Sequence, residues 1–263
     1  CNAPIYSALE ESGYMPKVVH ARDLKDIKVL VASHAQVLNA EEGKAIADFV
    51  KGGGLLIATP WLASCSPHGN ALTVYPTEET GLAGLLGFKL LNASQALAKE
   101  EVTASAFGLP QLTLTSKGKD NVLDIAPDVG VLGKHKDGTP LILSRKVGKG
   151  RVVYLNFLYD WDNWWNSFHE PAREAYRKLV DAIVRSDGRV KAEYFIAFES
   201  AEPSQDNKGW WQTPLKSKPN PGESVPWWSS QLYSDPSGRI KYLAIFSDHR
   251  SPAITGRLRW RQL

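Results

Sequence analysis

The clearest pattern of apolar and polar positions lies between residues 28 and 60, and it predicts a strand, a helix and a second strand. The runs from Lys28 to Ala32 and from Leu55 to Ala58 are apolar, which is typical of short strands buried in a parallel sheet. Between them, apolar residues recur at helical spacing on one face: Ala45, Ile46, Phe49 and Val50. The residues after the second strand are therefore expected at the carboxyl edge of a parallel sheet, where open α/β folds bind their ligands.

The ends of this helix are also marked in the sequence. Asn39 is a good N-cap residue, and Glu42 stands three positions later, which together form a capping-box pattern. The run from Gly52 to Gly54 predicts the end of the helix and a sharp turn into the second strand.

Similar patterns extend along most of the chain. They predict helices at three places: Pro4 to Ser12, Thr80 to Leu86 and Glu170 to Arg185. Further strands are predicted at Lys17 to Val19, Leu141 to Ser144 and Val152 to Phe157, the last two being joined at Lys149-Gly150. Residues 60 to 79 are rich in proline, serine and glycine and predict a long loop over the carboxyl edge of the sheet.

The composition changes near residue 190. Strands are predicted at Lys191 to Phe198, Ile240 to Phe246 and Gly256 to Trp260, whereas residues 200 to 239 are dense in proline, serine, asparagine and tryptophan and predict long loops. We therefore expect an α/β domain over residues 1–188, followed by a small antiparallel β-rich region over residues 189–263.

Composition and charge exclude several classes of function. The 263 residues include 43% hydrophobic and 22% charged residues, as in ordinary globular proteins, and the net charge of +3 does not favour nucleic acid. No apolar run approaches the roughly 20 residues of a membrane span. The six histidines show no metal-ligand spacing and no cofactor motif is present, so we expect neither a metal nor a cofactor.

The two cysteines, Cys1 and Cys65, are too few for a disulfide framework. Cys1 has two interpretations: the lipidated first residue of a processed lipoprotein at a cell surface or in a periplasm, or the start of a fragment of a cytoplasmic protein. An open α/β sheet normally begins on a strand, whereas this chain enters on a helix, so we expect a strand to be missing upstream.

Three stretches together resemble one known family. They are YSALEESGYMPKVVHARDLKDIKVLVASHAQVLNAEEGKAIADFVKGGGLLIAT, the later LLGFKLL and then GKGRVVYLNF. In order and spacing they resemble the trimerisation domain of family 42 β-galactosidases over roughly residues 5 to 186. The resemblance implies a flavodoxin-like fold of the class I glutamine amidotransferase type, an open parallel sheet with helices on both faces. It also implies a catalytic barrel earlier in the polypeptide and a small C-terminal β-domain.

An active class I amidotransferase carries a cysteine just after the second strand, where backbone N–H groups hold an oxyanion. Here Thr59 stands at that approximate position, and Pro60 has no N–H to donate. The expected histidine and glutamate after the strand Val152 to Phe157 are also missing, since the first such pair is His169-Glu170. The sequence therefore predicts a degenerate nucleophile position and no catalytic residue.

A tryptophan-rich segment follows the strand Val152 to Phe157 at the expected carboxyl edge. Tryptophan faces stack on sugar rings and carboxylates bridge hydroxyl groups, so the segment is a candidate sugar site formed by Asp160, Trp161, Asp162, Trp164 and Trp165. The alternative is that these indoles pack against the loop of residues 60–79 or against a neighbouring subunit.

These observations favour a non-catalytic assembly domain of a carbohydrate-active enzyme that resembles a β-galactosidase. Its expected partners are copies of itself and a carbohydrate, with no nucleic acid and no membrane span. Two alternatives stay open. One is a stand-alone cysteine hydrolase that uses Cys65 with His68 or His169, and the other is a surface-anchored sugar-binding lipoprotein with Cys1 acylated.

Overall fold

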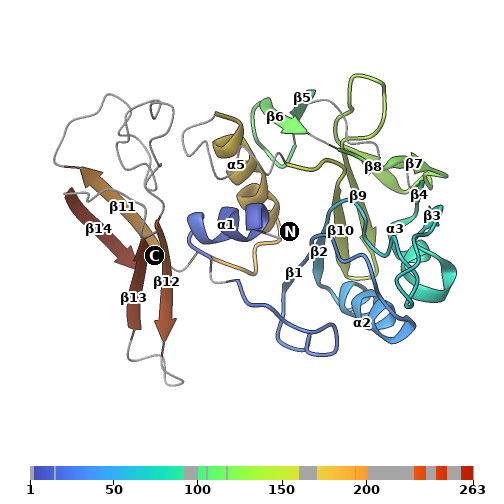
Figure 1. Ribbon diagram of the computed structural model, residues 1–263, viewed down its shortest axis with the longest axis horizontal. Coiled ribbons are helices and arrows are strands. Elements are labelled where there is room, and N and C mark those ends of the chain that lie inside the picture. Colours follow the sequence, from blue (N-terminus) through green and yellow to red (C-terminus); the bar gives the residue numbers. More distant parts are fainter. Residues whose placement is uncertain are drawn as a thin grey trace.

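The computed structural model describes residues 3–14, 16–91, 100–104, 106–116, 118–159, 171–192, 194–200, 228–234, 241–247 and 256–262. Its centre is a five-stranded sheet in the order β1-β2-β10-β9-β8 (Figure 1). The strands are β1 (Val29–Ala32), β2 (Leu55–Ala58), β8 (Val129–Val131), β9 (Ile142–Val147) and β10 (Gly150–Leu155).

The central sheet is mixed, which corrects the expectation of a parallel sheet. β1, β2 and β10 run parallel, but β9 pairs antiparallel with β10 and β8 pairs antiparallel with β9. The reason is the short turn at Gly148 and Lys149, because a two-residue connection can join only antiparallel strands. The wholly parallel part is thus limited to the strands on either side of β2.

The predicted strand–helix–strand unit is confirmed. Helix α2 (Ala40–Lys51) begins at the N-cap Asn39, whose side chain accepts from the Glu42 backbone while the Glu42 side chain accepts from the Asn39 backbone. The helix ends at Gly52, and Gly53 has a φ of 121°, a conformation that glycine alone adopts without strain. These local signals place β2 beside β1 in register, with Val31 opposite Ile57.

Alternating residues of the central strands point to opposite faces of the sheet, where they are buried in two separate hydrophobic cores. Leu55 and Ile57 of β2 face α1 (Ala3–Glu11) and α5 (Pro171–Arg185). Leu56 and Ala58 face the other side, where α2 packs. The helices therefore cover both faces of the sheet, α1 with α5 on one and α2 on the other (Figure 1). Just after α1, the hydroxyl of Tyr14 donates to Asp181 of α5 at 2.8 Å.

A second, three-stranded sheet extends the layer that contains α2. It consists of β3 (Val74–Tyr75), β4 (Lys89–Leu91) and β7 (Asn121–Leu123), all antiparallel. The 3₁₀ turn η1 (Glu78–Thr80) and helix α3 (Leu82–Leu86) connect β3 to β4. On the opposite face, the hairpin of β5 (Glu100–Ala104) and β6 (Leu112–Ser116) packs against α5, with Leu114 fully buried.

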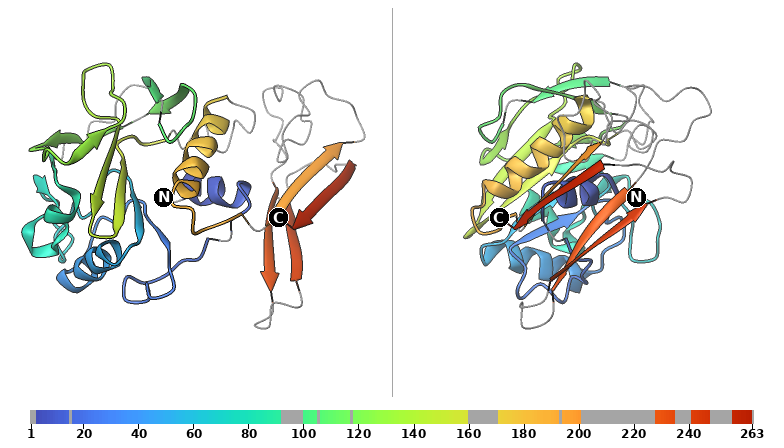
Figure 2. Two further views of the ribbon diagram at one scale, coloured as in Figure 1. Left: turned by 180° about the vertical axis from the view of Figure 1, so that it is seen from behind. Right: turned by 90° about the vertical axis from the view of Figure 1, so that its left-hand side faces the viewer.

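The last part of the chain forms two antiparallel pairs. β11 (Tyr194–Ser200) pairs with β14 (Gly256–Gln262), and β12 (Trp228–Ser234) pairs with β13 (Lys241–Ser247). In Figure 1 and in the left view of Figure 2, α1 and α5 lie between these strands and the central sheet.

Two sequence-based expectations are wrong in detail. Strand β12 lies inside the segment of residues 200–239 that its composition assigns to loops. No strand forms at Lys17 to Val19, where Val18 is 95% exposed instead of being buried in a sheet. In both cases composition alone, without a pairing partner, was a poor guide.

Candidate functional site

The candidate site is the carboxyl edge of the parallel strands, where the loops after β1 and β2 run side by side. The Thr59 hydroxyl accepts from the backbone N–H of His34 at 3.2 Å and donates to the Ser33 hydroxyl at 3.3 Å. Further along, Ala63 N donates to Ala35 O at 2.8 Å and Cys65 N donates to Gln36 O at 2.9 Å. The two loops are therefore joined by hydrogen bonds that continue the pairing of the strands.

Three residues of these loops adopt the left-handed conformation that non-glycine residues rarely take. They are His34 with a φ of 52°, Trp61 with 72° and Ala63 with 55°. The rings of His34 and Trp61 lie 5.2 Å apart between centroids and are tilted by 36°. Burial lowers the pKa of His34 to about 4, so its imidazole is neutral at pH 7. Such local strain persists only where surrounding contacts hold it.

The contact that holds Trp61 is the carboxylate of Asp120, which is 1% exposed. Its Oδ2 accepts from the backbone N–H of Trp61 at 3.2 Å and from the Tyr154 hydroxyl at 2.5 Å. Its Oδ1 accepts from the Tyr75 hydroxyl at 2.5 Å. Burial raises the pKa of Asp120, and burial together with the adjacent carboxyl raises the pKa of both tyrosines.

Asn156, just after β10, fixes the backbone of Asp120. The Asn156 side chain accepts from Asp120 N at 2.8 Å and donates to Asp120 O at 3.0 Å and to Pro140 O at 2.8 Å. The Asn156 carbonyl in turn lies 2.8 Å from Nε2 of the buried His135. Asp120 is thus held at both its side chain and its main chain.

These hydrogen bonds hold the loops in place, and they already occupy the polar groups that catalysis would need. The Thr59 side chain is buried, and its hydroxyl bonds to a serine and to a backbone amide instead of an imidazole. The next two residues offer no N–H for an oxyanion, because Pro60 has none and that of Trp61 is bound to Asp120. The first residue in the left-handed conformation after β2 is Trp61, two positions past the predicted nucleophile position at Thr59.

The alternative nucleophile, Cys65, lies in the loop after β2 and is half-buried. Its thiol is 4.0 Å from the Ser64 hydroxyl, and His68 stands exposed on the same loop. Within the part of the chain that the structure describes, no histidine bonds to this thiol. His169, the other candidate base, and Glu170 lie outside the described residues, as does Cys1.

The predicted sugar site also lies outside the described residues. This applies to Asp160, Trp161, Asp162, Trp164 and Trp165. The last described residue before them, Tyr159, forms a bridge with Ser116 and packs its ring 4.9 Å from that of Tyr176.

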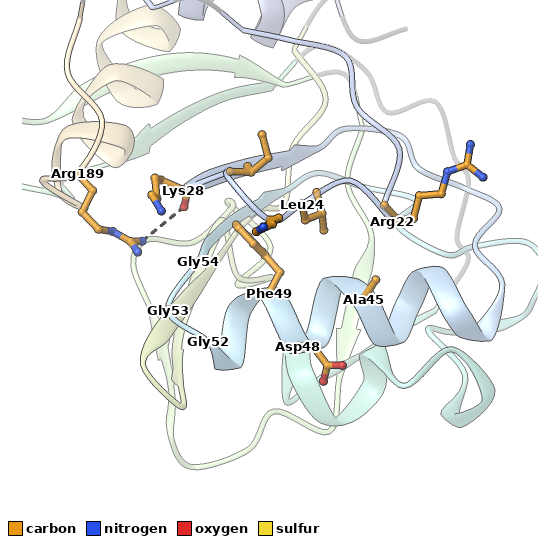
Figure 3. Close-up of a pocket in the computed structure, with 13 residues that line it drawn as sticks. Arg22, Leu24, Lys28, Ala45, Asp48, Phe49, Gly52, Gly53, Gly54 and Arg189 are labelled. Atoms are coloured by element: carbon orange, nitrogen blue, oxygen red, sulfur yellow. Dashed lines mark hydrogen bonds between the residues drawn. The ribbon is translucent and has the colours of Figure 1, made fainter.

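A depression of about 400 Å³ lies at the opposite, amino edge of the sheet (Figure 3). It is bounded by the loop before β1 and by the C-terminal end of α2. Arg189 stands at its border, where Nη2 donates to the Lys28 carbonyl at 3.5 Å and the guanidinium pairs with Asp187. Basic side chains near a helix C-terminus offset the negative end of the helix dipole, which gives them a structural role here.

The described ranges contain neither a cluster of metal-ligating side chains nor a helix that could span a membrane. No group of three or more histidine, cysteine, aspartate or glutamate side chains there could hold a metal ion. No helix among the described residues has the length and apolar character that a membrane crossing requires.

The network around Asp120 was not predicted from the sequence, although one signal was present. Tyr154 stands in an almost wholly apolar strand, and a buried tyrosine hydroxyl needs a hydrogen-bond partner. Asp120 itself stands in a polar turn between β6 and β7, where an aspartate is ordinary, so nothing local identified it as that partner.

Several solved structures that are similar to this chain are β-galactosidases. The enzyme from Bacillus circulans sp. alkalophilus superposes with a TM-score of 0.59 at 18% identity, over 74% of this chain and 29% of that chain. A catalytic mutant of Gan42B, a family 42 β-galactosidase from G. stearothermophilus, gives 0.57 at 17% identity, over 89% and 28%. The β-galactosidase from Rahnella sp. R3 gives 0.56 at 16% identity, over 99% and 36%. The chain therefore spans about a third of the length of these proteins, and at such identities the likeness establishes the fold.

No curated protein matches the chain at a significant level. A family model described as the beta-galactosidase trimerisation domain matches residues 4–157, which is more than half of the 263 residues. This range contains β1 to β10, the α2 side of the core and the whole Asp120 network. The chain belongs to the β-galactosidase trimerisation domain family.

Proposed function

We propose that this chain is a non-catalytic assembly domain, which associates with copies of itself within a carbohydrate-active enzyme that resembles a β-galactosidase. Membership of the trimerisation domain family supports association, and three copies is the number that the family description indicates. The division into an α/β domain at residues 1–188 and a β-rich region at residues 189–263 is part of the same proposal.

The observation that carries the non-catalytic part is the hydrogen bond from Trp61 N to Asp120, at the place where an amidotransferase would hold an oxyanion. A catalytic donor must be free to bind charge that develops in the transition state. Here the donor is bound to a buried carboxylate, and that carboxylate also accepts from two tyrosine hydroxyls. The edge of the sheet therefore serves to fix the loops.

The test is the mass of the chain in solution. Size-exclusion chromatography with light scattering should give a particle of three 29.0-kDa chains, near 87 kDa, at micromolar concentration. A mass that stays at 29.0 kDa up to high concentration would contradict an assembly role for this chain. Covalent acyl-enzyme on the isolated chain, detected by mass spectrometry with activated esters or amides, would contradict the non-catalytic part.

The sugar contact is a finer part of the proposal. The segment begins five positions after the last residue of β10, which is one of the strands whose carboxyl end forms the candidate site. Its residues are Asp160, Trp161, Asp162, Trp164 and Trp165. We expect a triple substitution of the three tryptophans by phenylalanine to abolish any change of tryptophan fluorescence on titration with galactose or lactose. If the native chain shows no change in fluorescence and no heat of binding with either sugar, the alternative of packing at these positions is favoured.

A further inference from the structure

The three-stranded sheet β3-β4-β7 has one face buried and one face toward solvent, and its register shows which residues occupy each. Tyr75, Leu90 and Val122 are paired across the strands and belong to the core beneath. Paired residues share a face and alternate residues face opposite sides. The outer face therefore carries Val74, Leu91 and Leu123, together with Lys89 and Asn121.

This outer face is more apolar than a solvated sheet face requires. Val74 is 40% exposed and Leu123 39% exposed, and Leu91 between them is half-buried. Antiparallel sheets that face water on one side normally place polar residues there. Ile125, just after β7, adds another apolar side chain that is 38% exposed. Lys89 and Asp124, which stand on β4 and just after β7, form an exposed ion pair with 3.7 Å between Nζ and Oδ2.

The position of the sheet leaves this face accessible. β3, β4 and β7 lie at the end of the molecule opposite α1, α5 and the two C-terminal strand pairs (Figures 1 and 2). β3 and β7 are also the edges of their sheet, and β8 is an edge of the central sheet close by in the chain. Open strand edges present unpaired backbone groups, with which another protein chain can pair.

We propose that Val74, Leu91 and Leu123, here called the outer patch, form the apolar centre of the contact with a second copy of this chain. The inference rests on the proposed assembly function, from which the identity of the occupant follows, since the family is a trimerisation domain. In a closed ring of three, the outer patch of each copy meets a different surface of the next.

The size of the patch defines its role. Three strands about 4.8 Å apart, each with about 10 Å of length, give a flat area of roughly 150 Å². A stable interface buries about 800 Å² on each partner. The outer patch is therefore the dry centre of a larger contact whose rim is polar and includes Lys89, Asn121 and Asp124. Residues at such a centre contribute most of the binding free energy.

The test uses the full chain and places a carboxylate in the patch. Leu123→Asp and Val74→Asp are each expected to raise the dissociation constant of the oligomer by roughly 30-fold or more, so that the mass falls toward 29.0 kDa at micromolar concentration. The matched control is Val18→Asp, which makes the same chemical change at a valine that is 95% exposed in the loop between α1 and β1. The control is expected to keep the native mass.

The outcomes separate the two proposals. A native chain that is monomeric overturns both, whereas a native oligomer that survives Leu123→Asp and Val74→Asp overturns only the outer patch. Circular dichroism identifies a variant that fails to fold, and hydrogen exchange on the native chain then decides. Amides of Asn121–Leu123 should exchange more slowly in concentrated than in dilute solution, while those of Val29–Ala32 should not change. Equal exchange of Asn121–Leu123 at both concentrations overturns the patch without any variant.

Discussion

Gly43, in the middle of α2, is a position where the addition of one methyl group should destabilise the fold. A Cβ built there would lie 1.9 Å from the Thr80 carbonyl oxygen, far inside the 3.4 Å at which ordinary contact begins. Because Gly43 carries only a hydrogen in place of a side chain, α2 and η1 can pack in direct contact. Because the obstacle is backbone, no side-chain rotation relieves the clash, and η1 must move away from the helix.

The expected magnitude follows from two opposing effects. Alanine favours a helix interior over glycine by about 1 kcal/mol, but overpacking of a tight contact costs typically 1–3 kcal/mol and sometimes more. With the contact 1.5 Å too short, we expect Gly43→Ala to lower the free energy of unfolding by about 2 kcal/mol net. In a chain of this size the melting temperature should fall by about 5 °C.

Gly84 in α3 provides the matched control. It lies in the middle of a helix and is exposed, and a Cβ there would meet nothing within 4 Å. Gly84→Ala should therefore raise the free energy of unfolding by about 0.5–1 kcal/mol, through helix propensity alone. Urea unfolding followed by circular dichroism measures both variants. If Gly43→Ala is as stable as the native chain or more so, the close approach of α2 and η1 is refuted.

Three further predictions concern the candidate site. Burial raises the pKa of Asp120 above its ordinary 3.8, so the folded state holds the carboxyl proton more tightly than the unfolded chain does. The contribution of Asp120 to stability therefore falls as the pH rises from 3.8 through the raised pKa of the folded state. Urea unfolding between pH 4 and 7 should therefore show the native chain losing stability relative to Asp120→Asn, and a constant or growing difference would contradict the burial of the charge. The imidazole of His34, whose pKa burial lowers to about 4, should show no NMR titration between pH 8 and 5.5, and a midpoint near the ordinary 6.5 would mean that water reaches the ring. Iodoacetamide should alkylate Cys65 no faster than a free model thiol at pH 7, because no described base contacts the sulfur, and a tenfold faster reaction would revive the cysteine hydrolase.

Where the fold depends on local signals, the sequence was a sufficient guide. The capping box at Asn39 and Glu42, the glycines after α2 and the apolar run of β2 are each defined by neighbours in the chain, and all formed as expected. The hairpin of β9 and β10 was also recognised, but its consequence for the sheet was not. A tight turn there makes β9 antiparallel, so the sheet is mixed and the parallel part is short.

The elements that escaped prediction depend on partners far away in sequence. Strand β12 is defined by its pairing with β13, and its own residues lie in a stretch with the composition of a loop. Conversely, the apolar residues at Lys17 to Val19 have no strand to pair with, and Val18 is left in solvent. Strand formation depends more on the neighbouring strand than on intrinsic preference, which is why both errors concern strands.

At the carboxyl edge of the sheet, where open α/β folds usually bind ligands, this chain has a network of internal hydrogen bonds. The loop after β1, the loop after β2, the turn before β7 and the end of β10 all meet at Asp120 or its hydrogen-bond partners. An enzyme keeps such an edge open, with donors free for substrate. Here each donor near Asp120 already has its acceptor, and a partly satisfied network of this kind would be costly in the interior. Under the proposed assembly role this rigidity would be useful, because contact surfaces that are already ordered lose less entropy when they associate.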